Sequence, residues 1–282
     1  MRFGLSIFLT DETITPVDMG RLAEQRGFDS LWLPEHTHMP LDHTPFPRGG
    51  DVPRHYQRTL DPFIALTAVA TATETLLLGF GICLITQRDP IVTAKQVATL
   101  DRLSGGRVLF GVGAGWNRPE LEHHGTPFDR RFGVMRERVE AMRALWTQEV
   151  ASYSGRYVRF GPSWQWPKPV QDPLPLYVGG NGEQVLERVL RYGDHWIPNR
   201  ERDLETRIPE LRRRAEQAGK PRPEVTYFGA DLDPASVERL ANAGVDRILL
   251  YLPPGGTDEV ERAVDRAAEL AAPFIPAREE DR

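Results

Sequence analysis

Cysteine is almost missing from this sequence. Cys83, in an apolar run, is the only one among 282 residues, which excludes an internal disulfide and predicts a small buried side chain. Long apolar runs are missing too, since no segment approaches the roughly 18 residues of a membrane-spanning helix. Residues 2–9 form a strand-like run without the basic region or cleavage site of a signal peptide. We therefore expect a cytoplasmic protein that does not bind a membrane.

Clusters of basic residues are also missing. The net charge is −5 and no run rich in lysine or arginine occurs, so we expect no nucleic-acid partner. The composition, 40% hydrophobic and 27% charged without low-complexity tracts, is that of a globular protein. A chain of this length can bury one large core, and no linker divides it. We expect a single domain over residues 1–282.

The sequence does contain a regular alternation of strand-like apolar runs and helical patterns. Asp-Pro pairs precede three of the helices, because Asp can cap free amides and Pro is tolerated at the first helical position. These pairs begin at Asp61, Asp89 and Asp233. Glycines end three helices, where the left-handed conformation lets the chain turn back. They are Gly27, Gly193 and Gly244.

The alternation predicts a (β/α)8 TIM barrel, with an open doubly wound sheet as the alternative fold. We expect strands near 2–9, 28–34, 76–84, 107–112, 175–178, 194–198, 224–230 and 246–252. Helices are expected near 16–26, 62–73, 90–103, 130–147, 182–192, 203–218, 234–242 and 257–271. The helix at 130–147 carries one apolar stripe of Phe132, Met135, Val139, Met142 and Leu145.

Two loop insertions interrupt this alternation. Residues 36–60 form a loop that is too long for a simple connection. Residues 149–174 are expected to form a short hairpin followed by a segment rich in Trp and Pro. We expect both insertions to shape a substrate pocket, and Trp116, Trp164 and Trp166 favour an apolar or aromatic ligand.

The candidate chemistry lies at the carboxyl ends of the strands, which meet on one face of such a barrel. Glu35 and His36 follow the second strand, and Gly-rich turns follow two later strands at 113–117 and 179–182. Glycine lets the backbone approach a ligand closely. The second turn leads into a helix, whose free amides suit an anionic group such as phosphate.

Three segments carry a resemblance to a known family. They are GFDSLWLPEH (27–36), LLLGFGICLITQRDPIVTAKQVATLDRLSGGRVLFGVGAGWN (76–117) and PLYVGGNGEQVLERVLRYGDHWIP (175–198). With them, the chain from residue 1 to about 200 resembles the bacterial-luciferase-like flavin and deazaflavin oxidoreductases. It is most similar to the branch that uses the deazaflavin coenzyme F420.

The resemblance implies a tricyclic cofactor lying across the barrel mouth, with a non-prolyl cis peptide beneath its ring at Gly81-Ile82. The cofactor-binding residues it implies are Gly81, Ile82, Gly113, Ala114, Gly115, Trp116, Asn117, Gly179, Gly180 and Asn181. In the sugar-phosphate dehydrogenases of the family a Glu takes the place of Trp116, so we do not expect a sugar phosphate as substrate. Dimers are common in the family, so the resemblance is compatible with a homodimer and leaves the oligomeric state open.

The resemblance places His36 beside the ring as the catalytic residue. An imidazole can supply or accept the proton that accompanies hydride transfer. Glu35 is the second catalytic candidate, and it either orients His36 or bonds to backbone amides. The expected reaction is hydride transfer between F420 and a small organic substrate.

Other functions remain open. The same barrel could serve an FMN-dependent monooxygenase supplied by a partner reductase, or a non-catalytic flavin-binding protein. His36 and His38 form an H-x-H pair, as in metal-dependent hydrolases, but no further ligand follows, so no metal is predicted. His123 and His124 are expected at a solvated helix edge. Arginines that could meet an acidic oligoglutamate tail of F420 are Arg48, Arg54, Arg58 and Arg88.

Overall fold

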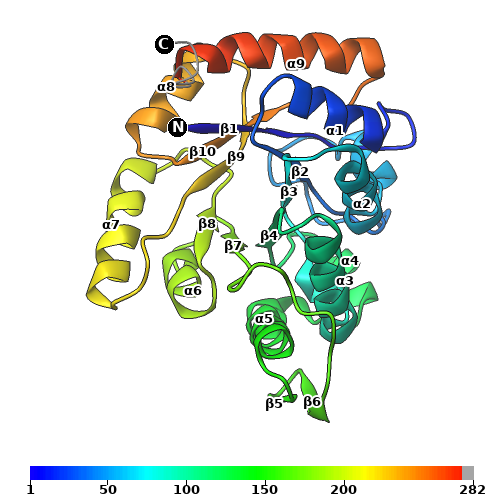
Figure 1. Ribbon diagram of the computed structural model, residues 1–282, viewed down its shortest axis with the longest axis vertical. Helices are drawn as coiled ribbons and strands as arrows, with labels where there is room; N and C mark the ends of the chain where they lie inside the picture. Colours follow the sequence, from blue (N-terminus) through cyan, green and yellow to red (C-terminus); the bar gives the residue numbers. More distant parts are fainter. Residues whose placement is uncertain (275–282) are drawn as a thin grey trace.

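The computed structural model describes residues 1–274 and shows a barrel of parallel strands surrounded by helices (Figure 1). The barrel strands are β1 (Arg2–Ser6), β2 (Ser30–Leu33), β3 (Leu77–Phe80), β4 (Val108–Val112), β7 (Leu176–Gly179), β8 (His195–Ile197), β9 (Thr226–Ala230) and β10 (Arg247–Tyr251). Their order is β8-β7-β4-β3-β2-β1-β10-β9. The two edges meet, because Trp196 N donates to Glu224 O at 2.9 Å and Phe228 N to Pro198 O at 2.8 Å. The (β/α)8 barrel is confirmed and the open sheet is excluded.

Helices follow the strands in the predicted order. They are α1 (Pro16–Gln25), α2 (Pro62–Ala72), α3 (Pro90–Leu103), α5 (Arg131–Thr147), α6 (Val185–Tyr192), α7 (Leu204–Gln217), α8 (Pro234–Asn242) and α9 (Thr257–Ala271). Short 3₁₀ turns are η1 (Arg54–Arg58), η2 (Ile85–Gln87), η3 (Phe128–Arg130) and η4 (Ala272–Phe274). One helix was not predicted, α4 (Arg118–His123), which lies between β4 and α5.

The predicted helix starts are confirmed at all three Asp-Pro pairs. Asp61 accepts hydrogen bonds from the first free amides of α2, and Asp89 and Asp233 do the same for α3 and α8. The left-handed conformation is confirmed at Gly27 (φ 79°) and Gly244 (φ 87°).

Gly193 does follow the last residue of α6, but the left-handed conformation predicted for it is wrong. Its backbone is extended, with φ −99° and ψ −174°. A Cβ at this position would lie 2.4 Å from Cγ2 of Val178. Glycine is therefore needed here because the end of α6 packs closely on β7, and not for a turn.

Helix α5 buries the predicted stripe except at its first position. Met135, Val139, Met142 and Leu145 are buried, whereas Phe132 is 38% exposed. The guanidinium of Arg188 lies 3.7 Å from the centre of the Phe132 ring, which therefore packs beneath a cation at the surface.

The barrel interior is filled by large side chains. Trp32 and Tyr177 pack edge to face with ring centres 5.3 Å apart, and Leu109, Ile197 and Leu249 complete this cluster. Gly79 makes room for the indole, because a Cβ there would lie 2.0 Å from Trp32 Cδ2. The interior is thus a packed core, and a ligand can bind only at its ends.

The predicted hairpin is confirmed as β5 (Ala151–Ser154) and β6 (Arg159–Ser163), which project beyond α5 at the bottom of Figure 1. The segment after it packs on α3, where Gln165 Nε2 donates to Ile91 O at 3.0 Å. Trp164 and Trp166 are 76% and 60% exposed. Within residues 1–274 neither indole packs against His36 or the rings beside it, and their part in a substrate pocket stays a prediction.

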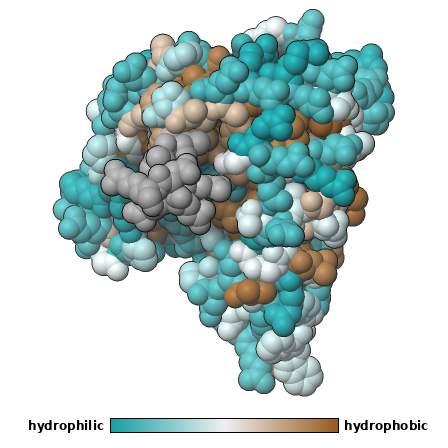
Figure 2. Space-filling view, turned by 45° about the horizontal axis from the view of Figure 1, so that its top comes forward, coloured by the Kyte–Doolittle hydropathy of each residue, from teal (hydrophilic) through white to brown (hydrophobic). Residues whose placement is uncertain are grey.

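The surface is mainly hydrophilic. Figure 2 shows hydrophobic side chains as separate areas among hydrophilic ones on the face in view. Among residues 1–274, no helix has the length and apolar character needed to cross a membrane.

Candidate functional site

A long loop covers the mouth at the carboxyl ends of the strands. We call residues 36–60 the lid. The lid leaves β2, and its Thr44 N donates to Asn117 Oδ1 at 2.9 Å in the turn after β4. It then reaches the turn after β8, where Arg200 donates to Pro47 O at 3.4 Å. Near its end, Thr59 pairs with Thr10 in the segment that follows β1.

His36 lies at the root of the lid and pairs with a carboxylate that the sequence did not identify. Its Nδ1 lies 3.1 and 3.0 Å from the two carboxylate oxygens of Glu120, on α4. The two side chains are only 7% and 1% exposed. A carboxylate only accepts hydrogen bonds at neutral pH, so Nδ1 carries the proton and Nε2 is left as the reactive nitrogen. Nε2 has no partner among the described residues and is not fully enclosed.

Glu120 could have been found only by combining two signals. It is an acid in the first turn of a very short helix, and it follows directly on the glycines after β4. An acid there ordinarily faces solvent and compensates the helix dipole. Its burial beside His36 depends on the lid, which the sequence does not position.

Glu35 has a different partner. Leu84 N donates to its Oε2 at 2.6 Å, and Arg88 Nε donates to its Oε1 at 2.6 Å. Arg88 also pairs with Asp61 at 2.7 Å. Burial opposes the charged form of Arg88, but the charge of Glu35 outweighs it and raises the pKa of the guanidinium. The expectation that Glu35 orients His36 is wrong, and the alternative, a bond to a backbone amide, is confirmed.

Two aromatic side chains pack against His36 and two more pack against these, and we call the four the aromatic wall. Tyr56 and Trp116 lie 5.0 and 6.0 Å from the imidazole, measured between ring centres. Phe46 joins them, 5.3 Å from Tyr56 and 5.8 Å from Trp116, and Phe8 lies 4.6 Å from Tyr56. Burial raises the pKa of Tyr56 to about 12, so its hydroxyl stays protonated at neutral pH. Only Trp116 of this wall was predicted.

Ile82 forms the floor of the mouth. The peptide bond between Gly81 and Ile82 is cis, as predicted. Added Cβ atoms at Gly113 and Gly179 would lie 1.6 and 3.0 Å from Cδ1 of Ile82. These glycines therefore make room for the Ile82 side chain, which is half-buried. Gly81 itself faces Phe228, because a Cβ added at Gly81 would lie 2.5 Å from Cε2 of the Phe228 ring.

The rest of the turn after β4 supports the lid. Ala114 O accepts from Thr86 Oγ1 at 3.1 Å, and Gly115 adopts φ 75°. Asn117 is fully buried and its side chain holds Thr44 of the lid. Of the positions predicted here to bind cofactor, Trp116 alone places its side chain in the aromatic wall.

The turn after β7 leaves several amides free. The N–H groups of residues 181–184 have no hydrogen-bond partner within residues 1–274, just before α6 begins at Val185. Gly180 has φ 121°, and a side chain there would meet nothing within 4 Å. A cluster of free amides at a helix N-terminus is suited to a phosphate. We call residues 180–184 the amide cradle.

Side chains from two neighbouring elements hold this cradle in place. Arg207 of α7 donates to Asn181 O at 2.7 Å and to Gly182 O at 2.8 Å. Asn199 N donates to the side-chain oxygen of Asn181 at 3.2 Å. The Asn181 side chain therefore positions the turn, whereas its backbone amide remains free.

A group of histidines fastens the lid to α4. His38 Nε2 lies 2.9 Å from His123 Nδ1. Thr37 Oγ1 bridges His38 Nδ1 and His124 Nε2, at 2.9 and 2.8 Å. His123 and His124 are thus not merely a solvated helix edge. No three His, Cys, Asp or Glu side chains in the described part of the chain are arranged to hold a metal ion.

The arginines expected to meet an acidic tail differ in their surroundings. Arg54 pairs with Glu12 at 2.5 Å, and Arg58 Nε with Asp11 at 2.8 Å. Arg88 forms ion pairs with Glu35 and Asp61, as described above. Arg48 alone among these four has no acidic partner within residues 1–274.

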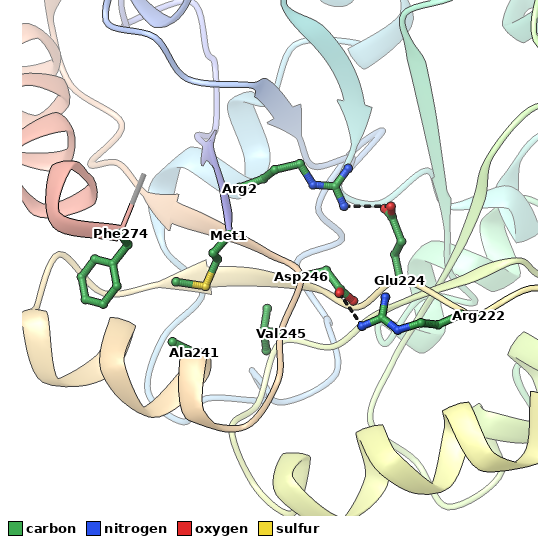
Figure 3. Close-up of a pocket in the computed structure, with 8 residues that line it drawn as sticks. All are labelled: Met1, Arg2, Arg222, Glu224, Ala241, Val245, Asp246 and Phe274. Carbon is green, nitrogen blue, oxygen red and sulfur yellow. Dashed lines mark hydrogen bonds and ion pairs between the residues drawn. The ribbon is translucent and has the colours of Figure 1, made fainter. Parts of the chain in front are cut away.

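A cavity of about 590 Å³ lies at the other end of the barrel. Figure 3 shows its lining residues Met1, Arg2, Arg222, Glu224, Ala241, Val245, Asp246 and Phe274. Arg2 pairs with Glu224 and Arg222 with Asp246, both at 2.8 Å. These residues flank the amino ends of β1, β9 and β10, so the cavity is remote from the end where barrel enzymes carry their sites.

Comparison with known proteins identifies the family. The sequence model described as luciferase-like monooxygenase matches residues 15–230. The chain belongs to the luciferase-like family.

Relatives of this luciferase-like chain cover its whole length. An uncharacterised protein of Mycobacterium tuberculosis is 42% identical over 279 residues, or 96% of this chain and 99% of the relative. The structure of the monooxygenase RslO1 from Streptomyces bottropensis matches with a TM-score of 0.80 and 20% identity, over 97% of this chain and 99% of that one. An F420-dependent secondary alcohol dehydrogenase matches with a TM-score of 0.76 and 21% identity, over 96% and 98%. The luciferase-like chain is an enzyme of the oxidoreductase or monooxygenase kind.

Proposed function

We propose that this luciferase-like protein is an F420-dependent oxidoreductase, which transfers a hydride between the deazaflavin and an organic substrate. The observation that carries the proposal is the buried pair of His36 and Glu120 beneath the lid, since it presents Nε2 as a proton carrier in the mouth. The solved F420-dependent alcohol dehydrogenase with the same fold is consistent with this cofactor. The whole chain would act as one domain in the cytoplasm.

The residues at the mouth fit such a cofactor. The free amides of the amide cradle and the open space above Gly180 suit its phosphate. The half-buried Ile82 offers an apolar surface for a planar ring, between the cradle and the aromatic wall. When bound, the deazaflavin would supply or accept the hydride.

The protein's own groups would handle the proton and exclude water. Glu120 holds the Nδ1 proton of His36, so in the neutral ring Nε2 can take a proton from an alcohol as it is oxidised, which leaves an imidazolium. In the opposite direction the imidazolium would give its Nε2 proton to a carbonyl oxygen as it is reduced, which returns the neutral ring. Glu120 also stabilises the imidazolium that forms after proton uptake. The lid and the aromatic wall cover the mouth and keep bulk water away.

Titration of the purified protein with each cofactor tests this proposal. F420 should bind at least about tenfold more tightly than FMN, which corresponds to about 1.4 kcal/mol. Reduced F420 should then be oxidised by a substrate without oxygen. Tighter binding of FMN, with oxygen consumption when reduced FMN is supplied, would favour a two-component monooxygenase instead. That alternative is supported by the fold shared with RslO1.

A further inference from the structure

One charge at the mouth remains unexplained by the proposed hydride transfer. Arg48 lies at the middle of the lid, and its Nη2 is 3.8 Å from the Cβ position of Gly229 at the carboxyl end of β9. The other lid arginines, Arg54 and Arg58, are neutralised by Glu12 and Asp11. Arg48 has no such partner in the described residues. Arg48 is exposed, and an unpaired guanidinium at the rim of a binding site favours an anionic ligand.

Two tyrosines from different elements lie near this guanidinium. Tyr56 belongs to η1 of the lid, and Tyr251 ends β10. Burial raises the pKa of each hydroxyl and the nearby charge of Arg48 partly offsets this. The hydroxyls therefore remain protonated donors at neutral pH. Gly229, which Arg48 approaches, precedes Ala230, and Ala230 pairs with Leu250 beside Tyr251. His55 contacts both tyrosines, at 5.1 Å from Tyr56 between ring centres and 3.5 Å from Tyr251 Oη. Tyr56 Oη has no hydrogen-bond partner in residues 1–274 and is not fully enclosed.

The histidine beside them does not compete for the role of the cation. Burial lowers the pKa of His55, and the neighbouring His36 lowers it further. His55 is thus neutral at pH 7 and lies 3.5 Å from Tyr251 Oη, a long contact. Glu201 and Asp231 are the acids whose charges act with that of Arg48 on Tyr227 of β9, and Glu201 is already paired with Arg239 at 2.9 Å. Among residues 1–274, Arg48 is therefore a guanidinium without an acidic partner on this side of the mouth, as is Arg200, which donates to Pro47 O at 3.4 Å.

Tyr56 connects this group to the reaction centre. Its ring packs 5.0 Å from the imidazole of His36 and 4.6 Å from Phe8. A ligand that lies against the aromatic wall, with its reacting atom near His36, can therefore extend to the side where Arg48 and Tyr251 lie.

We infer that Arg48, Tyr56 and Tyr251 form a carboxylate subsite, and that the substrate is an organic acid with a planar apolar body. The guanidinium would bind the carboxylate and the two hydroxyls would donate to it. The inference rests on the proposed function for the identity of the site. The acidic tail of the cofactor could supply the same chemical group, so the experiment distinguishes these two sources.

Binding of benzoate and of benzamide, its neutral analogue, tests the subsite directly. Calorimetry on the full-length protein, without cofactor and with F420, should show tighter binding of benzoate. Arg48→Gln should lower the affinity for benzoate by about 10- to 100-fold, as expected for the loss of a hydrogen bond to a charged group. Its affinity for benzamide should not change. Arg54→Gln is the matched control in the same loop, and it should bind both ligands as the wild type does.

Two outcomes overturn the inference. The first is equal binding of benzoate and benzamide by the wild type, or an equal loss in Arg54→Gln. The second is found by comparing F420 with its glutamate tail and F420 truncated at the phosphate. Arg48→Gln would lose affinity for the tailed form only, while its affinity for benzoate would stay unchanged. That result would assign the subsite to the cofactor tail. The preference for benzoate over benzamide can be measured without F420. The test can therefore be interpreted even if the protein does not bind F420.

Discussion

His36 connects two chemically different parts of the site. One nitrogen of its ring faces the buried carboxylate of Glu120, and the other is open to the mouth. Because Glu120 comes from α4 and His36 from the end of β2, the pair forms only when the turn after β4 is correctly folded. The function of one residue thus depends on two segments that are far apart in the sequence.

Replacing His36 with Ala should lower turnover by about 10²–10⁴-fold, the usual contribution of a positioned acid or base. F420 affinity should change much less, because the amide cradle is unaffected. The pH dependence of the rate should be lost with the imidazole. Stopped-flow measurement of F420 oxidation at several pH values gives the turnover rate and its pH dependence. Full activity and an unchanged pH profile in His36→Ala would show that the imidazole is not the proton carrier. Cofactor binding without turnover in the wild type, unaffected by this substitution, would support a non-catalytic flavin-binding protein.

Glu120→Gln should show an intermediate loss. The amide can still accept a hydrogen bond from Nδ1, but it does not stabilise the imidazolium. We therefore expect kcat to fall while the KM for substrate stays close to that of the wild type, and the pH profile to shift relative to it. A variant with an unchanged pH profile would show that Glu120 has only a structural role.

Gly180→Val should weaken cofactor binding sharply. The side chain would project beside the free amides of the cradle, and φ 121° is unfavourable for a branched residue, at a cost of about 1–3 kcal/mol. Gly219→Val is the control, because Gly219 also has a positive φ and open space but lies between α7 and β9. Equal F420 affinities in the two folded variants would exclude the cradle as the phosphate site.

At the scale of elements, local signals predicted most of the barrel, because each βα unit carries its own start and stop residues. The Asp-Pro pairs and Gly27 act within a few residues of where they stand, so sequence alone reveals them. Gly193 was misinterpreted because the reason for it is a contact with Val178 on another element. The lid path and Glu120 were missed for the same reason, since both depend on contacts between distant segments.

The strand ends beneath the mouth leave little space for side chains. A Cβ on Gly111 would lie 2.0 Å from the backbone oxygen of Phe80, which cannot move independently of β3. Gly111→Ala should therefore lower the free energy of unfolding by about 1–3 kcal/mol or more, as measured by urea denaturation. Gly161→Ala, on the open hairpin with no atom within 4 Å, should change it by less than about 0.5 kcal/mol. Similar losses in both variants would refute this account.

For the whole molecule, stability in acid should depend on Asp246 at the amino end of the barrel. Burial would raise the pKa of Asp246, but hydrogen bonds from Val225 N–H and Arg222, with the charge of Arg212, hold it below the usual 3.8. A lowered pKa in the folded state contributes stability that is complete above the unfolded value and is lost as pH falls through the folded one. This contribution is therefore present at neutral pH and disappears below about pH 4.

Urea denaturation between about pH 6 and pH 3 tests this dependence. Asp246→Asn should be less stable than the wild type at the upper limit, because it lacks the ionised partner of Arg222 and Arg212. The difference between the two proteins should narrow as the pH falls. A constant difference over this range would show that the carboxylate charge does not contribute.

The lid has a consequence for how such enzymes diverge. It starts after β2, and before the chain enters α2 its Thr59 pairs with Thr10 in the segment after β1; β1 and β2 are neighbours in the sheet. A segment whose ends lie side by side can change length or content with little effect on the scaffold. The proton carrier stays at the fixed root of this segment, while Arg48 and Tyr56 stand in its exchangeable middle. Substitutions or length changes within the lid could therefore change the substrate range, while the proton-transfer groups stay the same.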